Sequence, residues 1–270
     1  MAARCAFTGV RADCIGAPSG IRKLALLADI IARTFKAFMR QPSLPTATRS
    51  SWLRQLAQRL LYLWPVKAVG TTVFMVAFFQ AYFFVLRNPG STPRVMPQIW
   101  LDHGVPFAPQ AFGVYASLWV YVSLPPALMG NFRGLVRFTI WVTLMCALCL
   151  ALFWAFPTQV PEPSIDWSAY PYLSFLKGVD ASGNACPSLH VASAVFTTFW
   201  LHHLFGAMGA PRALGWMSHL FCVAIAWSTL ATLQHVALDV LAGALVGWVF
   251  ARLSLYQAQA ALRAPRCALA

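Results

Sequence analysis

Two short polar segments in this very apolar chain carry residues that could act on a phosphate group. The first runs from Cys186 to His190, where a proline and a serine precede the histidine. Proline suits the first turn of a helix, and the backbone N–H groups of that turn, with the helix dipole, can bind phosphate. Ser188 adds a hydroxyl donor or only caps the helix, and His190 can hold or give a proton. This segment therefore predicts a helix start that receives a phosphate group.

The second segment runs from Ser228 to Asp239 and contains His235, four residues before the aspartate. On a helix, His235 and Asp239 would share one face. A carboxylate that accepts the Nδ1–H of a histidine fixes the tautomer and leaves Nε2 as a nucleophile. Asp239 is also the only acidic residue inside any predicted membrane span, where ionisable groups are costly and usually functional. The pair is therefore a candidate catalytic unit.

The surrounding chain has the composition of a helical membrane protein. It is 59% hydrophobic and only 10% charged, whereas a soluble domain carries about 25% charged residues. We predict an all-α integral membrane fold with six transmembrane helices, each of about 20 apolar residues. The predicted spans are Ala68–Leu86, Ala111–Leu128, Phe138–Phe156, Pro187–Phe205, Ala213–Thr229 and His235–Leu253. No Gly or Pro marks the last turn, which we place near Thr232 because one continuous helix would be too long for a bilayer.

We predict three parts along the chain: a basic cytoplasmic or interfacial segment over residues 1–67, a membrane domain over 68–255, and a cytoplasmic tail over 256–270. Apolar residues at helical spacing predict a basic amphipathic helix over Ile21–Arg40, lying on the inner membrane surface, and a second amphipathic stretch over Ser51–Leu63. The formal charge of +13 does not indicate nucleic acid, because the basic residues crowd the ends of apolar segments, as cytoplasmic flanks do.

The distribution of charge predicts the orientation. With the N-terminus inside, 17 of the 20 Lys and Arg residues lie on the cytoplasmic side, which the positive-inside rule favours. We expect both termini in the cytoplasm, in a bacterial inner (plasma) membrane, and both polar segments at the outer face. The outer loops then hold three cations, Arg87, Arg94 and Lys177. Lys177 lies nearest to a polar segment and is our candidate for binding phosphate.

The two segments resemble the second and third motifs of the type 2 phosphatidic acid phosphatase superfamily, and the resemblance covers roughly residues 68–255. The matching residues are Pro187-Ser188-x-His190 and Ser228-x6-His235-x3-Asp239. The resemblance implies that His235 is the nucleophile that forms a phosphohistidine, that Asp239 orients it, and that His190 protonates the leaving oxygen. It also implies that Ser188 holds phosphate and that no metal or cofactor takes part.

Two features depart from that family. Its first motif, a Lys several residues ahead of an Arg-Pro pair, is not visible in the chain, and Thr229 stands where the third motif has Arg. The run Ser-Thr-Leu-x-Thr-x-Gln-His-x3-Asp instead resembles the branch of inositol phosphotransferases and sphingomyelin synthases. That branch keeps the two histidines and the aspartate and moves a phosphorylated head group between lipids.

These observations predict an enzyme that acts on a lipid phosphate, either a phosphatase or a head-group phosphotransferase, with water or another alcohol as acceptor. The missing cations motivate an alternative, a non-catalytic lipid-binding or transport protein on the same scaffold. The remaining candidates have simpler interpretations. Cys146 and Cys149 form a CxxC inside an apolar run, which favours packing over metal binding. The other histidines of the predicted spans and their flanks, His202, His203 and His219, are interpreted as packed or interfacial.

Overall fold

The structure, a computed structural model, describes two long stretches of the chain and two isolated residues, namely 51–174, 183–263, Asp29 and Arg33. The chain divides into two compact units, Met1–Pro42 and Ser43–Ala270, and both polar segments belong to the second. Of the amphipathic helix predicted over Ile21–Arg40, only the two isolated residues are described, and they are helical and form an ion pair of 2.7 Å. The rest of that predicted helix and Lys177 lie outside the described residues.

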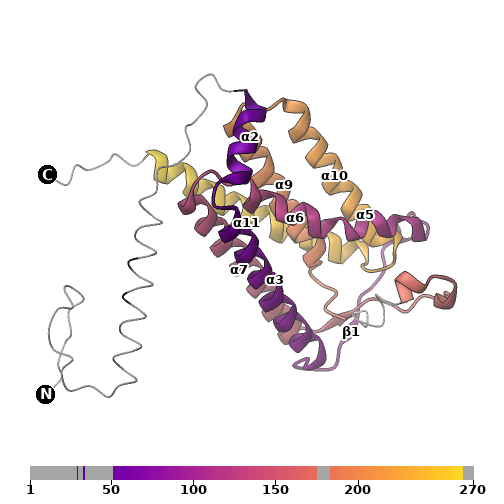
Figure 1. The fold of residues 1–270 in the computed structure, drawn as a ribbon. Helices are drawn as coiled ribbons and strands as arrows, with labels where there is room; N and C mark the ends of the chain where they lie inside the picture. Colours follow the sequence, from indigo (N-terminus) through magenta and orange to yellow (C-terminus); the bar gives the residue numbers. More distant parts are fainter. Residues whose placement is uncertain (1–28, 30–32, 34–50, 175–182, 264–270) are drawn as a thin grey trace, which may run out of the picture. The chain divides into compact units, whose positions relative to one another are not determined.

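Helices make up most of the second unit (Figure 1). In chain order they are α2 (Trp52–Leu61), α3 (Trp64–Arg87), α4 (Trp100–His103), η1 (Pro109–Ala111), α5 (Phe112–Ala116), α6 (Leu118–Ala127), α7 (Phe132–Ala155), η2 (Trp167–Ala169), α9 (Leu189–Met208), α10 (Arg212–Ala231) and α11 (Ala237–Arg263). The two described strands, β1 (Arg94–Val95) and β2 (Thr158–Gln159), form a short parallel pair in the loops. The predicted all-α membrane fold is confirmed.

Five helices are long and apolar enough to cross a membrane: α3, α7, α9, α10 and the part of α11 up to Gln257. They correspond to the first, third, fourth, fifth and sixth predicted spans. The amphipathic stretch predicted before the first span is helical as α2. The protein is therefore a multi-pass membrane protein.

The second predicted span, Ala111–Leu128, is divided rather than continuous. The N–H of Ser117 closes α5 by donating to the Gly113 carbonyl, and the Ser117 carbonyl accepts from Tyr121 in α6. From the start of α5 to the end of α6 the chain rises about 24 Å, at 1.5 Å per helical residue. That is less than the roughly 30 Å of a hydrocarbon core. The predicted count of six spans is therefore not confirmed.

The turn between α10 and α11 falls at the predicted Thr232, which caps α10. Leu233 follows in the left-handed conformation, with φ of 56°. The N–H groups of Gln234 and His235 both donate to the Thr229 carbonyl, at 2.9 and 3.2 Å. Glycine is the usual residue for such a helix end. Because a leucine takes its place, the turn carries no Gly or Pro signal in the sequence.

α9 is the central helix of the unit and packs against α6, α7, α10 and α11. In the most apolar stretch of α9, 56% of the residues are buried, whereas none are buried in the most apolar stretch of α3. The hydroxyl of Tyr121 on α6 lies 2.7 Å from the Thr198 hydroxyl on α9 and 2.6 Å from the Ser218 hydroxyl on α10. Paired polar groups of this kind fix membrane helices against one another.

α11 approaches α9 closely through two glycines one helical turn apart. A Cβ on Gly243 would collide with the carbonyl oxygen of Ser188, and a Cβ on Gly247 would collide with that of Ala192. Small residues at this spacing let membrane helices touch backbone to backbone. The contact brings the start of α9 against the first turns of α11, where the two polar segments lie.

Candidate active site

Ser188 joins the two polar segments through its backbone. It is the N-cap of α9 and is fully buried. Its hydroxyl oxygen accepts a hydrogen bond of 3.3 Å from the Val191 N–H, which satisfies one of the donors at the helix start. Its own N–H donates to the carbonyl oxygen of Asp239 at 3.0 Å. The structure thus gives Ser188 a capping contact, and its contact with phosphate stays a prediction.

His235 and Asp239 face each other, although not along one helix as expected. α11 begins at Ala237, so His235 lies in the preceding turn and Asp239 lies in the first turn of the helix. Nδ1 of His235 is 3.6 Å from Oδ2 of Asp239, which is longer than a hydrogen bond. Contacts in catalytic sites are often this long without substrate and tighten when it binds.

Asp239 also has a structural contact. Its Oδ2 accepts the Val236 N–H at 3.0 Å, the half of a capping box that an acidic residue at the third helical position makes. Its Oδ1 is buried and has no hydrogen-bond partner within the described chain. Burial and, secondly, the Asp239 carboxylate raise the pKa of the neighbouring Cys186 thiol to about 11. Asp239 is therefore a fully buried carboxylate with spare acceptor capacity beside His235.

Two aromatic rings hold His190 in place. Its ring stacks on Tyr115, with centroids 4.3 Å apart and planes inclined by 20°, and it meets Trp119 edge-on at 5.6 Å. The ring centroid of His235 lies 6.2 Å away. Nε2 of His190 and Nδ1 of His235 are buried without a hydrogen-bond partner in the described part of the chain. Unpaired buried polar atoms are rare in folded proteins. Three of the five in the described chain belong to the predicted trio, and the other two belong to Gln55.

Of the three predicted outer cations, two can be placed. The Arg87 guanidinium lies over the Phe83 ring, 5.8 Å from its centroid. Arg94 is exposed in β1, opposite Thr158 in β2. The Thr158 hydroxyl accepts the Cys186 N–H at 2.8 Å, so β2 connects the strand of Arg94 to the first polar segment. Lys177 lies outside the described residues.

Thr229, which stands in the place of an arginine, is fully buried. Its hydroxyl donates to the Ala226 carbonyl at 2.8 Å. Its carbonyl accepts the two N–H groups of the turn that ends at His235. Thr229 therefore shapes the turn that presents His235.

A comparison with known protein families gives one match. The family model of the PAP2 superfamily matches residues 138–263, a range that runs from α7 to the end of α11 and contains both polar segments. This part of the chain is a PAP2 superfamily domain. No curated protein and no solved structure matched it. PAP2 members are phosphatases, and membership supports a phosphatase or phosphotransferase that acts on lipid phosphates.

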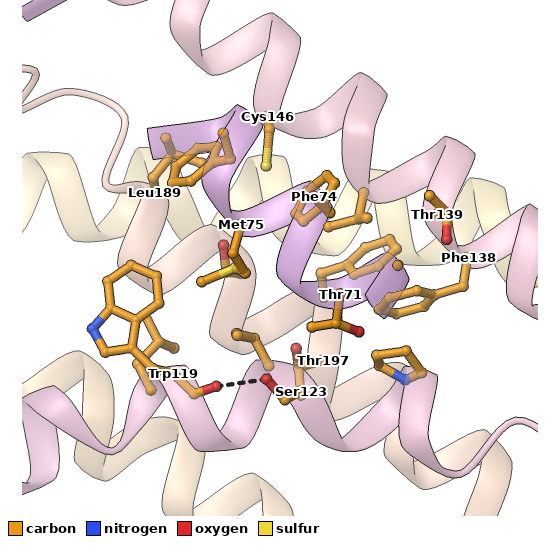
Figure 2. Close-up of a pocket in the computed structure, with 18 of the residues that line it drawn as sticks. Thr71, Phe74, Met75, Trp119, Ser123, Phe138, Thr139, Cys146, Leu189 and Thr197 are labelled. Atoms are coloured by element: carbon orange, nitrogen blue, oxygen red, sulfur yellow. Dashed lines mark hydrogen bonds between the residues drawn. The ribbon is translucent and has the colours of Figure 1, made fainter. Parts of the chain in front are cut away.

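His190 and His235 line an apolar cavity of about 400 Å³. Figure 2 shows side chains from four helices facing this space, among them Met75 on α3, Trp119 on α6, Phe138 on α7 and Leu189 on α9. Lys67 lines the cavity as well. Its ammonium donates to the carbonyl oxygens of Arg59 at 2.6 Å and Ala127 at 2.8 Å.

Sequence reasoning misses two residues that support the PAP2 site. One is Tyr115, which lies in the second predicted span and carries no motif of its own. The other is Asp102 in α4, whose Oδ1 accepts the Ala237 N–H and whose Oδ2 accepts the Ile99 N–H, each at 2.7 Å. Asp102 holds the start of α11 beside His235 from 135 positions away. No local pattern in the sequence signals a contact at that separation.

The remaining cysteine and histidine candidates have packing contacts in the structure. Cys146 and Cys149 are buried with Phe153 in one apolar cluster. Nδ1 of His219 lies 2.8 Å from the Gly215 carbonyl oxygen of its own helix. Within the described residues, no group of three or more His, Cys, Asp and Glu side chains is arranged to hold a metal ion.

Proposed function

We propose that this PAP2 protein is a lipid-phosphate phosphatase or head-group phosphotransferase that works through a phosphohistidine on His235. The observation that carries the proposal is the convergence of His190, His235 and Asp239 beside an apolar cavity. The imidazoles lie 6.2 Å apart, and both line the cavity. The carboxylate lies 3.6 Å from the His235 ring. A lipid phosphate combines the two groups that this arrangement fits, a phosphate and a hydrocarbon chain.

In the first step, Nε2 of His235 attacks the phosphorus atom, and the bond between phosphorus and the leaving oxygen breaks. His190 gives its proton to that oxygen. Asp239 faces Nδ1, the nitrogen opposite the nucleophile, so it holds the productive tautomer and stabilises the positive charge that develops on the ring. The product is the released alcohol and a phosphorylated His235.

In the second step, an acceptor hydroxyl attacks the phosphohistidine and His190 takes its proton. The phosphorus–nitrogen bond breaks, and His235 returns to its starting form. With water as acceptor the protein is a phosphatase, and with a lipid alcohol it is a phosphotransferase. The third motif resembles that of inositol phosphotransferases and sphingomyelin synthases, and this resemblance supports transfer to a lipid alcohol.

The charge on phosphate requires a cation or equivalent donors. Lys177 is the candidate from the sequence. Arg94 is the described alternative, because its strand connects through Thr158 to the backbone of Cys186. The excess of Lys and Arg on the other side supports an outer-face site and cytoplasmic termini in a bacterial inner membrane.

A non-catalytic lipid-binding or transport role is the second candidate. Thr229 favours this role, because this buried residue stands where the family has an arginine that would bind phosphate. Its hydroxyl donates to a carbonyl of its own helix instead. The two candidates differ in what they require of the histidines. Lipid binding or movement that is indifferent to His190→Ala and His235→Ala would identify the second.

The test is an assay of the purified protein in detergent with a panel of lipid phosphates and head-group donors. Free phosphate and new lipid products are both followed, beside His235→Ala and a matched His219→Ala control. We expect His235→Ala to abolish turnover and His219→Ala to retain it. Phosphate release identifies a phosphatase, and a new lipid without phosphate release identifies a transferase. Equal turnover in the wild type and His235→Ala would overturn the mechanism.

A further inference from the structure

We propose that the cavity binds one hydrocarbon chain of the lipid phosphate, and that the wall around Gly70 sets the longest chain it accepts. This inference rests on the proposed function, because a phosphate at the histidines is what directs the chain inward. It adds a chain-length limit and a structural location for that limit.

The cavity runs along one face of α3. The lining residues of α3 include Lys67, Gly70, Phe74, Phe78 and Tyr82, which recur at helical spacing. Tyr82 packs on Phe153 in the cluster that contains Leu189, next to His190. Gly70 lies about 18 Å from Tyr82 along the helix axis, at 1.5 Å of rise per residue. The cavity is therefore a long channel with the histidines near one end.

The wall of the channel suits hydrocarbon. Most of the lining side chains are apolar or aromatic, and two of the hydroxyl groups among them bond to their own helices. Ser123 donates to the Trp119 carbonyl at 2.8 Å, as the dashed line in Figure 2 shows, and Thr139 donates to the Leu135 carbonyl at 3.0 Å. Such hydroxyls offer little to a polar ligand, whereas a chain placed here gains apolar burial.

The far end of the channel fits the end of a chain. Lys67 lines this end, and its ammonium is held by two backbone carbonyls. Gly70 lines the cavity and is exposed, and a Cβ on it would meet nothing within 4 Å, so a larger side chain fits there. A lipid with its phosphate at the outer face has about 15 Å, half of a hydrocarbon core, before its chain reaches the bilayer midplane. The distance from Tyr82 to Gly70 along the helix axis, about 18 Å, is slightly longer than this. Gly70 therefore lies where a long chain ends.

The volume favours one chain. About 400 Å³ lies near the small end of ligand cavities, which range over about 300–1,000 Å³. A second chain of the same lipid would lie outside the cavity. The cavity can therefore select a lipid by the length of one chain, but not by the number of chains.

The experiment measures equilibrium binding of octyl, dodecyl and hexadecyl phosphate to the purified protein in detergent. Gly70→Phe fills the far end of the channel, and Thr71→Phe does so from the neighbouring position, which also lines it. Gly206→Phe is the matched control, because Gly206 is exposed on α9, does not line the cavity and also has no neighbour within 4 Å of a Cβ. Phosphate release from the same compounds is recorded in parallel.

In the wild type and Gly206→Phe, affinity should rise with chain length, by up to about fourfold for each methylene that enters the cavity. Gly70→Phe and Thr71→Phe should bind hexadecyl phosphate about tenfold or more weakly and bind octyl phosphate as the wild type does. An unchanged length dependence in both filled variants overturns the inference, and so does an equal loss for all three phosphates.

The binding data separate this inference from the proposed function. One outcome is that affinity rises with chain length, that the filled variants bind only the shorter chains as the wild type does, and that the wild type neither releases nor transfers phosphate. This outcome supports the chain site and counts against catalysis. Turnover that depends on His235, with the same length preference in every variant, supports catalysis and overturns the chain site.

Discussion

The N–H of Ser188 donates a hydrogen bond of 3.0 Å to the carbonyl oxygen of Asp239, so the start of α9 and the first turn of α11 form one backbone-linked unit. His190 lies two residues after Ser188, and His235 lies four residues before Asp239. The separation of the two histidines therefore depends on how closely α9 and α11 pack. The glycines of α11 make that packing possible.

Gly243→Ala should disturb this unit. The added Cβ would collide with the Ser188 carbonyl oxygen, and overpacking of this kind costs about 1–3 kcal/mol. We expect a lower melting temperature in detergent and a loss of phosphate release or transfer of about tenfold or more, because the start of α9 must move. Gly206→Ala, which adds a Cβ in open space on α9, should match the wild type. Wild-type turnover in Gly243→Ala would contradict the role of this contact.

Asp239 should tolerate asparagine structurally but not catalytically. The asparagine oxygen can still accept the Val236 N–H, whereas the negative charge beside Nδ1 of His235 is lost. We expect kcat to fall by roughly 10²–10⁴-fold at a nearly unchanged melting temperature. Asp239→Ala should lose both activity and stability, because it also removes the cap. A kcat for Asp239→Asn within about threefold of the wild type would reduce Asp239 to a helix cap.

We expect Tyr115 to act as a positioning residue through its stack on His190, with ring centroids 4.3 Å apart. Aromatic pairs contribute about 0.5–1.5 kcal/mol beyond burial, so Tyr115→Leu should lower kcat about fivefold with a smaller change in KM. Tyr115→Phe keeps the stacked ring and should restore kcat. Steady-state kinetics on all three proteins gives the comparison. Equal kcat values for Tyr115→Leu and Tyr115→Phe would show that the stack has no part in catalysis.

Cys186 should stay unreactive at neutral pH. Burial and the nearby Asp239 carboxylate raise its pKa to about 11, so the neutral thiol predominates until the pH approaches that value. Alkylation of Cys186 by iodoacetamide, followed by peptide mass spectrometry, should be slow near neutrality and accelerate as the pH rises. In Asp239→Asn the acceleration should begin at lower pH, because one cause of the raised pKa is gone. Rapid labelling of the wild type at neutral pH would contradict this environment.

The sequence was sufficient for the membrane fold, because hydropathy is a local property. It predicted both polar segments at one membrane face but not the contact between them. It was insufficient where distant contacts decide. Ser117 divides the second span. Leu233 adopts the left-handed backbone conformation that glycine favours, which its residue type does not predict. Asp102 and Tyr115 reach the site from other elements. The helical face predicted for His235 also fails, because α11 begins two residues after it.

The central claim is a covalent phosphate on His235, and the most direct test is to trap it. The purified protein is mixed briefly with a lipid phosphate that carries a radiolabelled phosphate group, quenched in alkali, and digested to locate the label. An acid-labile, alkali-stable label on the peptide that contains His235, absent from His235→Ala and present in His219→Ala, is the predicted result. A label on another residue, or turnover that persists in His235→Ala, would contradict the account.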